Sequence, residues 1–188
     1  EGLDMFSSIR WKFIVVYFLL VFIAMVIVGI FIVDRLEQQQ IDSVITSMEH
    51  KLETIASSSS YLTSDDWVSN REEIQKAINE LGISGTETLY VILNEDVPTI
   101  LATSLKPYER IVGKSAFQQK FIDPTLVLRA FEGEKAPNKE TIDNISLEHL
   151  AYPVISSIGK VTGILYMTSD LQNVYATVNE SKTILTNA

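Results

Sequence analysis

The sequence predicts an α+β domain in which helices cover an antiparallel sheet, preceded by one transmembrane helix that continues into a long helix. Three observations support this class. The run from Phe13 to Val33 carries no charge over 21 residues. Short β-rich runs joined by tight turns fill much of the second half, and segments with helical spacing stand before, between and after them. The order lacks the regular strand and helix alternation of a parallel doubly wound fold.

The composition excludes several classes of function. Among 188 residues, 15 are Lys or Arg and 24 are Asp or Glu, which gives a formal net charge of −9. Binding to a phosphate backbone requires clustered positive charge, so we expect no nucleic-acid partner. The chain has no cysteine, which excludes a disulfide framework and a thiolate metal site.

The apolar run has the length of a membrane span. At about 1.5 Å per residue, a helix over 13–33 is roughly 30 Å long and matches the hydrocarbon core of a bilayer. Arg10 and Lys12 flank its amino side, and the stretch that begins at Asp34 is net acidic. Since basic flanks stay in the cytoplasm, we expect a cell-membrane protein with a cytoplasmic N-terminus at 1–12 and an extracytoplasmic region after about Asp34.

The segment 34–60 is predicted to continue the span as a membrane-proximal signalling helix, because neither Pro nor Gly interrupts it. Apolar residues recur there at steps of three and four: Ile41, Ile45, Met48, Leu52 and Ile55. Such a stripe fits the seam of a homodimer or a contact with the chain's own domain, and we expect both along its length.

Residues 61–169 are predicted to form the extracytoplasmic domain. Ser69-Asn70-Arg71-Glu72 has the pattern of a capping box and opens an amphipathic helix that Gly82 ends. The period then changes to that of strands. The runs 89–93 and 99–103 are predicted to form a hairpin around an acidic turn.

The carboxyl-terminal half adds a helix, strands and a final helix. Asp123-Pro124 is predicted to cap and start a short helix that ends before Gly133. The polar stretch 134–144 predicts at best an edge strand, and two better strands follow at 148–156 and 160–168. Ser169-Asp170-Leu171-Gln172 is a second capping box, which opens an exit helix at 170–188 toward a transmembrane segment expected beyond Ala188.

The motifs of common catalytic sites fail on spacing. Gly113-Lys114-Ser115 lacks the first glycine of the Walker pattern. Neither His50 nor His149 has the spacing that puts two metal ligands on one face. We therefore expect no catalytic residue, no metal site and no cofactor in this chain.

Aromatic and polar residues near the predicted sheet are the remaining candidates for a ligand site: Tyr90, Tyr108, Arg110, His149, Tyr152 and Tyr166. In one interpretation the tyrosine rings fill the core and Arg110 is exposed. In the other, the six side chains converge on a small ligand. Arg110 would favour an anion, whereas the acidic surface would favour a cation or a cationic peptide.

Two blocks of sequence carry a resemblance to a known family. The first comprises Ser8-Ile9-Arg10-Trp11-Lys12-Phe13, Tyr17-Phe18-Leu19-Leu20, Ile23-Ala24-Met25, Gly29 and Leu36-Glu37. It resembles the amino terminus of WalK-type (YycG) sensor histidine kinases of Gram-positive bacteria. The second, Gly159 to Met167 with Val174 to Asn179, resembles the last strand and exit helix of that family's extracytoplasmic domain.

The resemblance implies a PAS-like (Cache or PDC) sensor fold, a homodimer and a role in two-component signalling. It further implies a parent chain with a second span, a HAMP linker and a phosphoryl-transfer core that acts on a response regulator. The family's stimulus is tied to cell-wall state, so a cell-wall-derived ligand or a regulatory membrane protein is an expected partner. The resemblance also implies histidine kinase activity of the parent protein. The present chain shows no phosphoacceptor or ATP-binding motif, so we expect that activity to reside in another part of the parent protein.

Three other classes of protein share parts of this organisation. The input domain of a chemoreceptor would have the same architecture and differ beyond Ala188. A single-pass exported binding or scaffold module would have no second span. A membrane-anchored hydrolase would require a nucleophile or converging carboxylates, which the sequence does not suggest.

Overall fold

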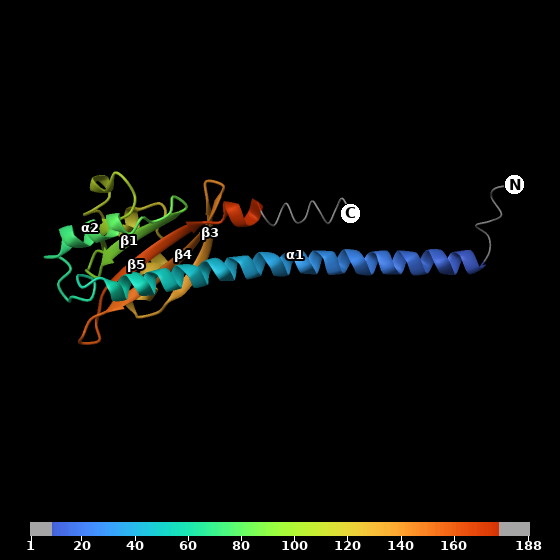
Figure 1. The fold of residues 1–188 in the computed structure, drawn as a ribbon, viewed down its shortest axis with the longest axis horizontal. Helices are drawn as coiled ribbons and strands as arrows, with labels where there is room; N and C mark the ends of the chain where they lie inside the picture. Colours follow the sequence, from blue (N-terminus) through green and yellow to red (C-terminus); the bar gives the residue numbers. More distant parts are fainter. Residues whose placement is uncertain (1–8, 177–188) are drawn as a thin grey trace. The chain divides into compact units, whose positions relative to one another are not determined.

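The computed structural model describes residues 9–176, and the chain divides into two compact units. The first contains the described residues 9–40 and 174–176, and the second contains residues 41–173. The elements in chain order are α1 (Ile9–Ser58), α2 (Arg71–Glu80), β1 (Glu87–Leu93), β2 (Thr99–Thr103), η2 (Tyr108–Arg110), η3 (Ala116–Gln118), α3 (Pro124–Phe131), β3 (Ala136–Ile142), β4 (Ile145–Ile155) and β5 (Val161–Asp170). Figure 1 labels α1, α2, β1, β3, β4 and β5.

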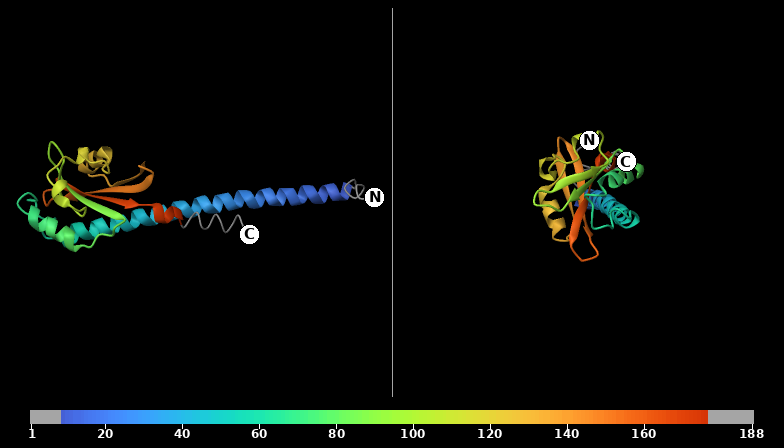
Figure 2. Two further views of the ribbon diagram at one scale, coloured as in Figure 1. Left: turned by 90° about the horizontal axis from the view of Figure 1, so that it is seen from above. Right: turned by 90° about the vertical axis from the view of Figure 1, so that its left-hand side faces the viewer.

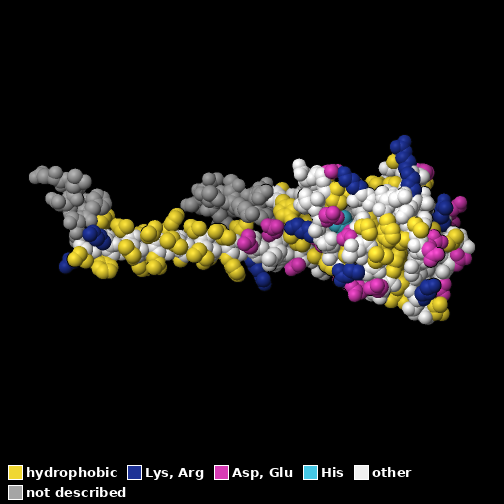
Figure 3. All heavy atoms as spheres, turned by 180° about the vertical axis from the view of Figure 1, so that it is seen from behind, with side chains coloured by type: hydrophobic (Ala, Val, Ile, Leu, Met, Phe, Trp, Pro, Cys, Tyr) yellow, Lys and Arg dark blue, Asp and Glu magenta, His cyan; other side chains and the backbone are white. Residues whose placement is uncertain are grey.

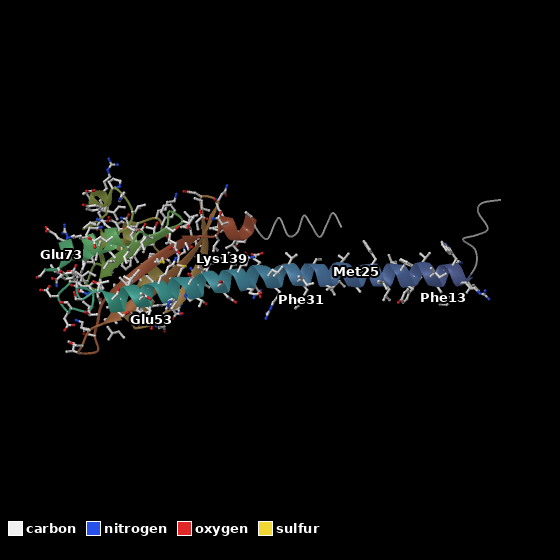
Figure 4. The ribbon with its side chains drawn as sticks, viewed as in Figure 1. Phe13, Met25, Phe31, Glu53, Glu73 and Lys139 are labelled. Atoms are coloured by element: carbon white, nitrogen blue, oxygen red, sulfur yellow. The ribbon has the colours of Figure 1, made fainter. Side chains whose placement is uncertain are left out.

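The first unit contains the apolar half of α1. Within the described residues, α1 is the one helix long and apolar enough to cross a membrane. Its large side chains are exposed, and Phe13, Met25 and Phe31 project outward from the helix (Figure 4). The space-filling view shows hydrophobic side chains along this length, with Lys or Arg at its amino end (Figure 3). An all-round apolar surface is what lipid contact requires. The predicted continuity of the span with the signalling helix is confirmed, since both lie in α1.

A five-stranded antiparallel sheet forms the centre of the second unit, with the strand order β2-β1-β5-β4-β3. The predicted hairpin is β1 and β2, and the predicted turn at 157–159 joins β4 to β5. Gly159 in that turn has φ +82°, a conformation that glycine adopts at little cost. The polar stretch before β4 forms β3 at the sheet edge, as predicted, and its exposed polar side chains suit an edge strand.

One face of the sheet is covered by α1 residues 41–58 and by α2 (Figure 2). Trp67 belongs to the same core cluster. Met48 and Leu52 are 0% exposed and pack with Leu89, Val91, Leu150 and Leu165 of the sheet. These contacts make the carboxyl-terminal part of α1 an integral part of the domain core.

The predicted dimer seam is therefore corrected at Met48, Leu52 and Ile55. These three side chains are buried in the chain's own core and cannot form an intermolecular seam without leaving it. A coiled-coil seam and a stripe on a core-facing helix have nearly the same spacing, so the sequence does not distinguish them. Ile41 and Ile45 are partly buried, and their place in a homodimer stays a prediction.

The other face of the sheet is covered by α3 and by the η3 region. Its core contains Tyr90 and Ile92 of β1 and Ile164 and Tyr166 of the central strand β5. Val127 and Ala130 of α3 pack against them. The alternation of neighbours along β1 and β5 between these two clusters follows from the two-residue period of a strand.

The helix ends agree with the predictions in part. Asp123 caps α3, with its side chain accepting a hydrogen bond from the Thr125 N–H, and Pro124 is the first helical residue. The predicted capping box at 69–72 is wrong, because Asn70 is the N-cap of α2 and makes no side-chain cap bond. Asp170, which ends β5, accepts a hydrogen bond from the Gln172 N–H and precedes residues 172–176, which are helical. The rest of the predicted exit helix lies outside the described residues.

Candidate functional site

His149 and Tyr166 form a buried polar pair on the α3 side of the sheet. His149 lies on β4 and Tyr166 on β5, and His149 Nδ1 is 2.8 Å from Tyr166 Oη. The register pairs His149 with Thr168, so Tyr166 is its diagonal neighbour on the same face. The imidazole is 0% exposed, and the two rings pack edge to face with centroids 5.9 Å apart.

The pair is tied to the start of α3 and to the sheet edge. Tyr166 Oη accepts a hydrogen bond from the Asp123 N–H at 2.8 Å. One carboxylate oxygen of Asp123 caps α3, and the other accepts from Asn138 Nδ2 of β3 at 2.8 Å. Three strands and the amino end of α3 thus meet in one hydrogen-bonded network, which fixes α3 against the sheet.

Burial decides the protonation of this network. It lowers the pKa of His149, an effect that the nearby carboxylates of Glu140 and Asp123 oppose, and it raises the pKa of Tyr166. The imidazole is therefore neutral and the phenol protonated at neutral pH. A phenol held in this form is neither a base nor a nucleophile.

One ring nitrogen of His149, Nε2, has no hydrogen-bond partner among the described residues. Tyr166 Oη either donates to Nδ1 or accepts from it, and in both tautomers Nε2 has no hydrogen-bond partner among the described residues. An unpaired buried ring nitrogen costs free energy unless another group pairs with it. The His149–Tyr166 pair thus has a structural role, and His149 Nε2 is its one polar atom without a partner among the described residues.

Tyr90 belongs to the same face. It lies directly opposite Tyr166 in the β1–β5 register, with ring centroids 6.4 Å apart at 63°. Burial raises its pKa to about 12. Tyr90, His149 and Tyr166 are thus the predicted site residues that the fold brings together.

The other three candidates lie elsewhere. Tyr152 lies on the α1 side of the sheet, where Lys135 Nζ stands 4.4 Å from its ring centroid. Tyr108 and Arg110 belong to η2, and Arg110 is exposed. The six side chains do not converge on one pocket. The prediction of buried rings holds for Tyr90 and Tyr166, and Arg110 is exposed as expected.

Glu148 is a further residue of interest that no pattern in the sequence marks. This residue of β4 is 2% exposed and lies on the α1 side of the sheet, opposite in direction to His149. Burial raises its pKa to about 7; Lys139 of β3 (Figure 4) opposes that shift, and Asp42 of α1 adds to it. Oε2 has no hydrogen-bond partner among the described residues. The protonation of Glu148 is thus set mainly by its burial, with smaller and opposed influences from Lys139 and Asp42.

The chain is similar to sensor proteins in sequence and in fold. It is 25% identical to the sensor histidine kinase WalK of Bacillus subtilis, in an alignment that covers 96% of this chain. The structure resembles the sensor domain of the histidine kinase DctB from V. cholerae with a TM-score of 0.54 and 16% identity, over 75% of this chain and 54% of that one. It also matches the periplasmic sensory domain of the Campylobacter jejuni chemoreceptor Tlp1, with a TM-score of 0.49 and 12% identity, over 78% of this chain and 61% of that one.

These findings confirm the resemblance to WalK-type sensor kinases, and the likeness to the DctB sensor domain confirms the PAS-like fold. No family model matches the chain. The chain spans 29% of the length of the WalK relative, so the alignment concerns a part of that protein.

Proposed function

We propose that this chain is the signal-sensing region, with its membrane anchor, of a two-component sensor histidine kinase. Residues 41–173 sense a stimulus outside the cytoplasm, and α1 passes the resulting change to the membrane. In the parent protein a kinase core would transfer phosphate to a response regulator. The state of the cell wall is the stimulus that the WalK resemblance suggests.

One structural observation carries this proposal. A single helix, α1, contains both the apolar stretch and the residues Met48 and Leu52, which are completely buried in the sensory domain. A change in the packing of that core therefore acts on the same helix that enters the membrane. A stimulus shifts such an equilibrium only through unequal affinity for its two states.

The proposed orientation places the amino terminus in the cytoplasm and the domain outside. The basic residues Arg10 and Lys12 on the amino side support it, since positive flanks are retained in the cytoplasm. An alkaline phosphatase reporter fused after Ala188 should be active, and a cytoplasmic reporter at the same place should be inactive. The reverse pattern would overturn the orientation.

We further propose that the protein works as a homodimer in which Ile41 and Ile45 contribute to the contact between subunits. Both are partly buried and lie on α1 on the amino-terminal side of Met48, which is completely buried. Two parallel copies of α1 would bring these positions of the stripe together.

Kinase output tests the proposal directly. Residues 1–188 replace the aligned region of B. subtilis WalK, and autophosphorylation of the chimera is measured in membrane vesicles. Met48→Ala, which leaves a cavity between α1 and the sheet, should change the rate at least about twofold. Glu53→Gln, at an exposed position of the same helix, should not. An inactive chimera, or equal rates in the two variants, would count against an input role.

A further inference from the structure

A row of polar side chains crosses the face of the sheet that α1 covers. Glu87 of β1, Ser169 of β5, Glu148 of β4 and Lys139 of β3 are direct neighbours in the strand registers, and all four lie on the α1 side. The two middle members, Ser169 and Glu148, are only 7% and 2% exposed. A carboxyl group is thus buried where the first helix packs on the sheet.

Two ion pairs join α1 to the rest of the domain near this row. Lys51 of α1 binds Glu87, the β1 member of the row. Glu49 of α1 lies 3.7 Å from the Nζ of Lys135, which directly precedes β3. Both lysines therefore have a carboxylate other than Glu148 as their partner.

Glu148 itself belongs to no ion pair among the described residues, and its Oε2 is inaccessible to solvent and makes no hydrogen bond there. Lys139 of β3 (Figure 4) and Asp42 of α1 act on it with opposite sign. Both are exposed, so water screens their charges. Ser169, its neighbour on β5, carries no charge. Burial therefore dominates and favours the neutral carboxyl.

Ionisation of Glu148 in this place is costly. The neutral group leaves one acceptor oxygen unpaired, whereas the ionised group leaves a full negative charge in the interior without a donor. The cost is relieved when the surrounding elements separate enough to admit water. Ladder hydrogen bonds join β3, β4 and β5, so α1 is the element that can move away.

The part of α1 nearest this charge is also its less firmly packed part. Val44 and Ile45 are only partly buried, whereas Met48 is completely buried in the core. Asp42, whose charge acts on the buried carboxyl, lies in the same stretch as the partly buried residues. Segments with few buried apolar contacts open at a lower free energy than the core. An opening confined to 41–47 therefore costs less than unfolding of the domain.

We propose that Glu148 makes the packing of α1 on the sheet depend on pH: its neutral carboxyl keeps residues 41–47 packed, and its ionisation loosens them. Loosening increases as the pH rises, because the packed state binds the proton more tightly than the open state. The response goes beyond the proposed sensory function and does not rest on it, since it can be measured without a kinase core.

Amide hydrogen exchange tests the proposal on the full chain of residues 1–188 in phosphatidylcholine nanodiscs. Measured rates are compared with the intrinsic rates of an unfolded chain at the same pH, which gives protection factors. The pKa of Glu148 is about 7 when packed, against 4.5 for the free side chain. Protection of 41–47 should therefore fall on the order of fiftyfold between pH 5 and pH 8. At both values β5 should be at least about a hundredfold better protected, since it exchanges only on unfolding.

Variants identify the group that titrates. Glu148→Gln should remove the pH dependence, and Glu53→Gln, at an exposed position of α1 (Figure 4), should keep it. Asp42→Asn should lower the pH at which protection reaches its lower plateau, and Lys139→Gln should raise it. These exposed residues respectively raise and lower the pKa of Glu148, so the two opposite shifts report its ionisation and not a loss of packing.

Equal protection of 41–47 at pH 5 and pH 8 in the wild type would overturn the proposal. An unchanged pH dependence in Glu148→Gln would also overturn it, as would plateau shifts in the same direction for Asp42→Asn and Lys139→Gln. Equal protection of 41–47 and β5 would show that α1 leaves the sheet only on complete unfolding, which the proposal excludes. None of these results would touch the proposed sensory function, which the chimera tests separately.

Discussion

Gly163 of β5 lies directly against the ring of Trp67. A Cβ atom placed on the glycine would stand 2.4 Å from Trp67 Cζ3 and 2.5 Å from the carbonyl oxygen of Ile92. Trp67 is itself held in place, since its Nε1 donates to the Leu62 carbonyl at 3.1 Å and its side chain is buried. The absence of a side chain at residue 163 is thus what lets the loop after α1 close over the sheet.

Gly163→Ala should therefore destabilise the domain by about 2–3 kcal/mol, because the backbone oxygen of Ile92 cannot move without breaking the β1–β5 pairing. Guanidinium unfolding of the full chain in detergent micelles, followed by tryptophan fluorescence, measures the change. Gly85→Ala is the matched control, since a Cβ there meets nothing within 4 Å. Equal stability of the two variants would contradict the close approach.

Tyr166→Phe should cost about 1–3 kcal/mol, because it leaves the Asp123 N–H and His149 Nδ1 without their common partner. The same unfolding assay measures it, with Tyr108→Phe as the control at a partly exposed position. The first residues of α3 should also lose protection from amide hydrogen exchange. Unchanged protection there would mean that the network does not fix α3.

Glu148→Gln should remove a pH dependence of stability. The pKa of Glu148 is about 7 in the folded chain against 4.5 for the free side chain, so the folded state binds more protons between these values. The stabilisation that the protonated Glu148 contributes to the free energy of unfolding is fully present below about pH 4.5. It is lost as the pH rises through 7, and the loss is on the order of 3 kcal/mol. His149 acts in the opposite direction, because its lowered pKa reduces stability as the pH falls.

The difference between the variant and the wild type isolates Glu148 from His149. Melting temperatures in nonionic micelles should agree near pH 5, and the Gln variant should be the more stable one at pH 8. Glu53→Gln, at an exposed position of α1, should follow the wild type at both values. Parallel curves for all three proteins would show that Glu148 ionises normally.

Substitutions along the apolar stripe of α1 should distinguish its core part, Met48 to Ile55, from the part proposed for the homodimer, Ile41 and Ile45. Met48→Asp should unfold the domain by placing a charge in its core, a cost of several kcal/mol. Ile41→Asp and Ile45→Asp together should leave the domain folded and weaken the homodimer. Circular dichroism reports the first outcome and sedimentation in density-matched detergent the second. A folded Met48→Asp protein, or an unaltered sedimentation profile for the double variant, would disagree with this division.

Much of the fold follows from local pattern. The uncharged run, the hairpin around residues 94–98, the cap at Asp123 and the turn at Gly159 each depend on residues close in sequence, and the structure has all four. The capping-box pattern places the N-cap of α2 at Ser69, one residue before the observed Asn70, because both are good N-cap residues.

The pairing of His149 with Tyr166 depends on the register between β4 and β5, which the hydrophobic pattern of the sequence does not determine. The β4–β5 pairing shifts by one residue between Val154 and Ile155. Without that bulge, His149 would lie opposite Met167 and point toward α1. With it, His149 lies opposite Thr168 and points to the Tyr166 side. A slip of one residue moves every side chain of a strand to the other face, so no composition argument could have paired His149 with Tyr166 or placed Glu148 under α1.

The unbroken course of α1 constrains how this protein can evolve. Each residue of an α-helix turns the chain by about 100°, so one residue inserted between 34 and 47 would rotate every upstream side chain by that angle relative to Met48 and Leu52. Seven inserted residues would restore the phase to within about 20°. Eleven inserted residues would restore the phase equally well. Homologues should therefore differ in the length of this stretch by seven or eleven residues or not at all, while the loops on the far side of the sheet gain and lose residues singly.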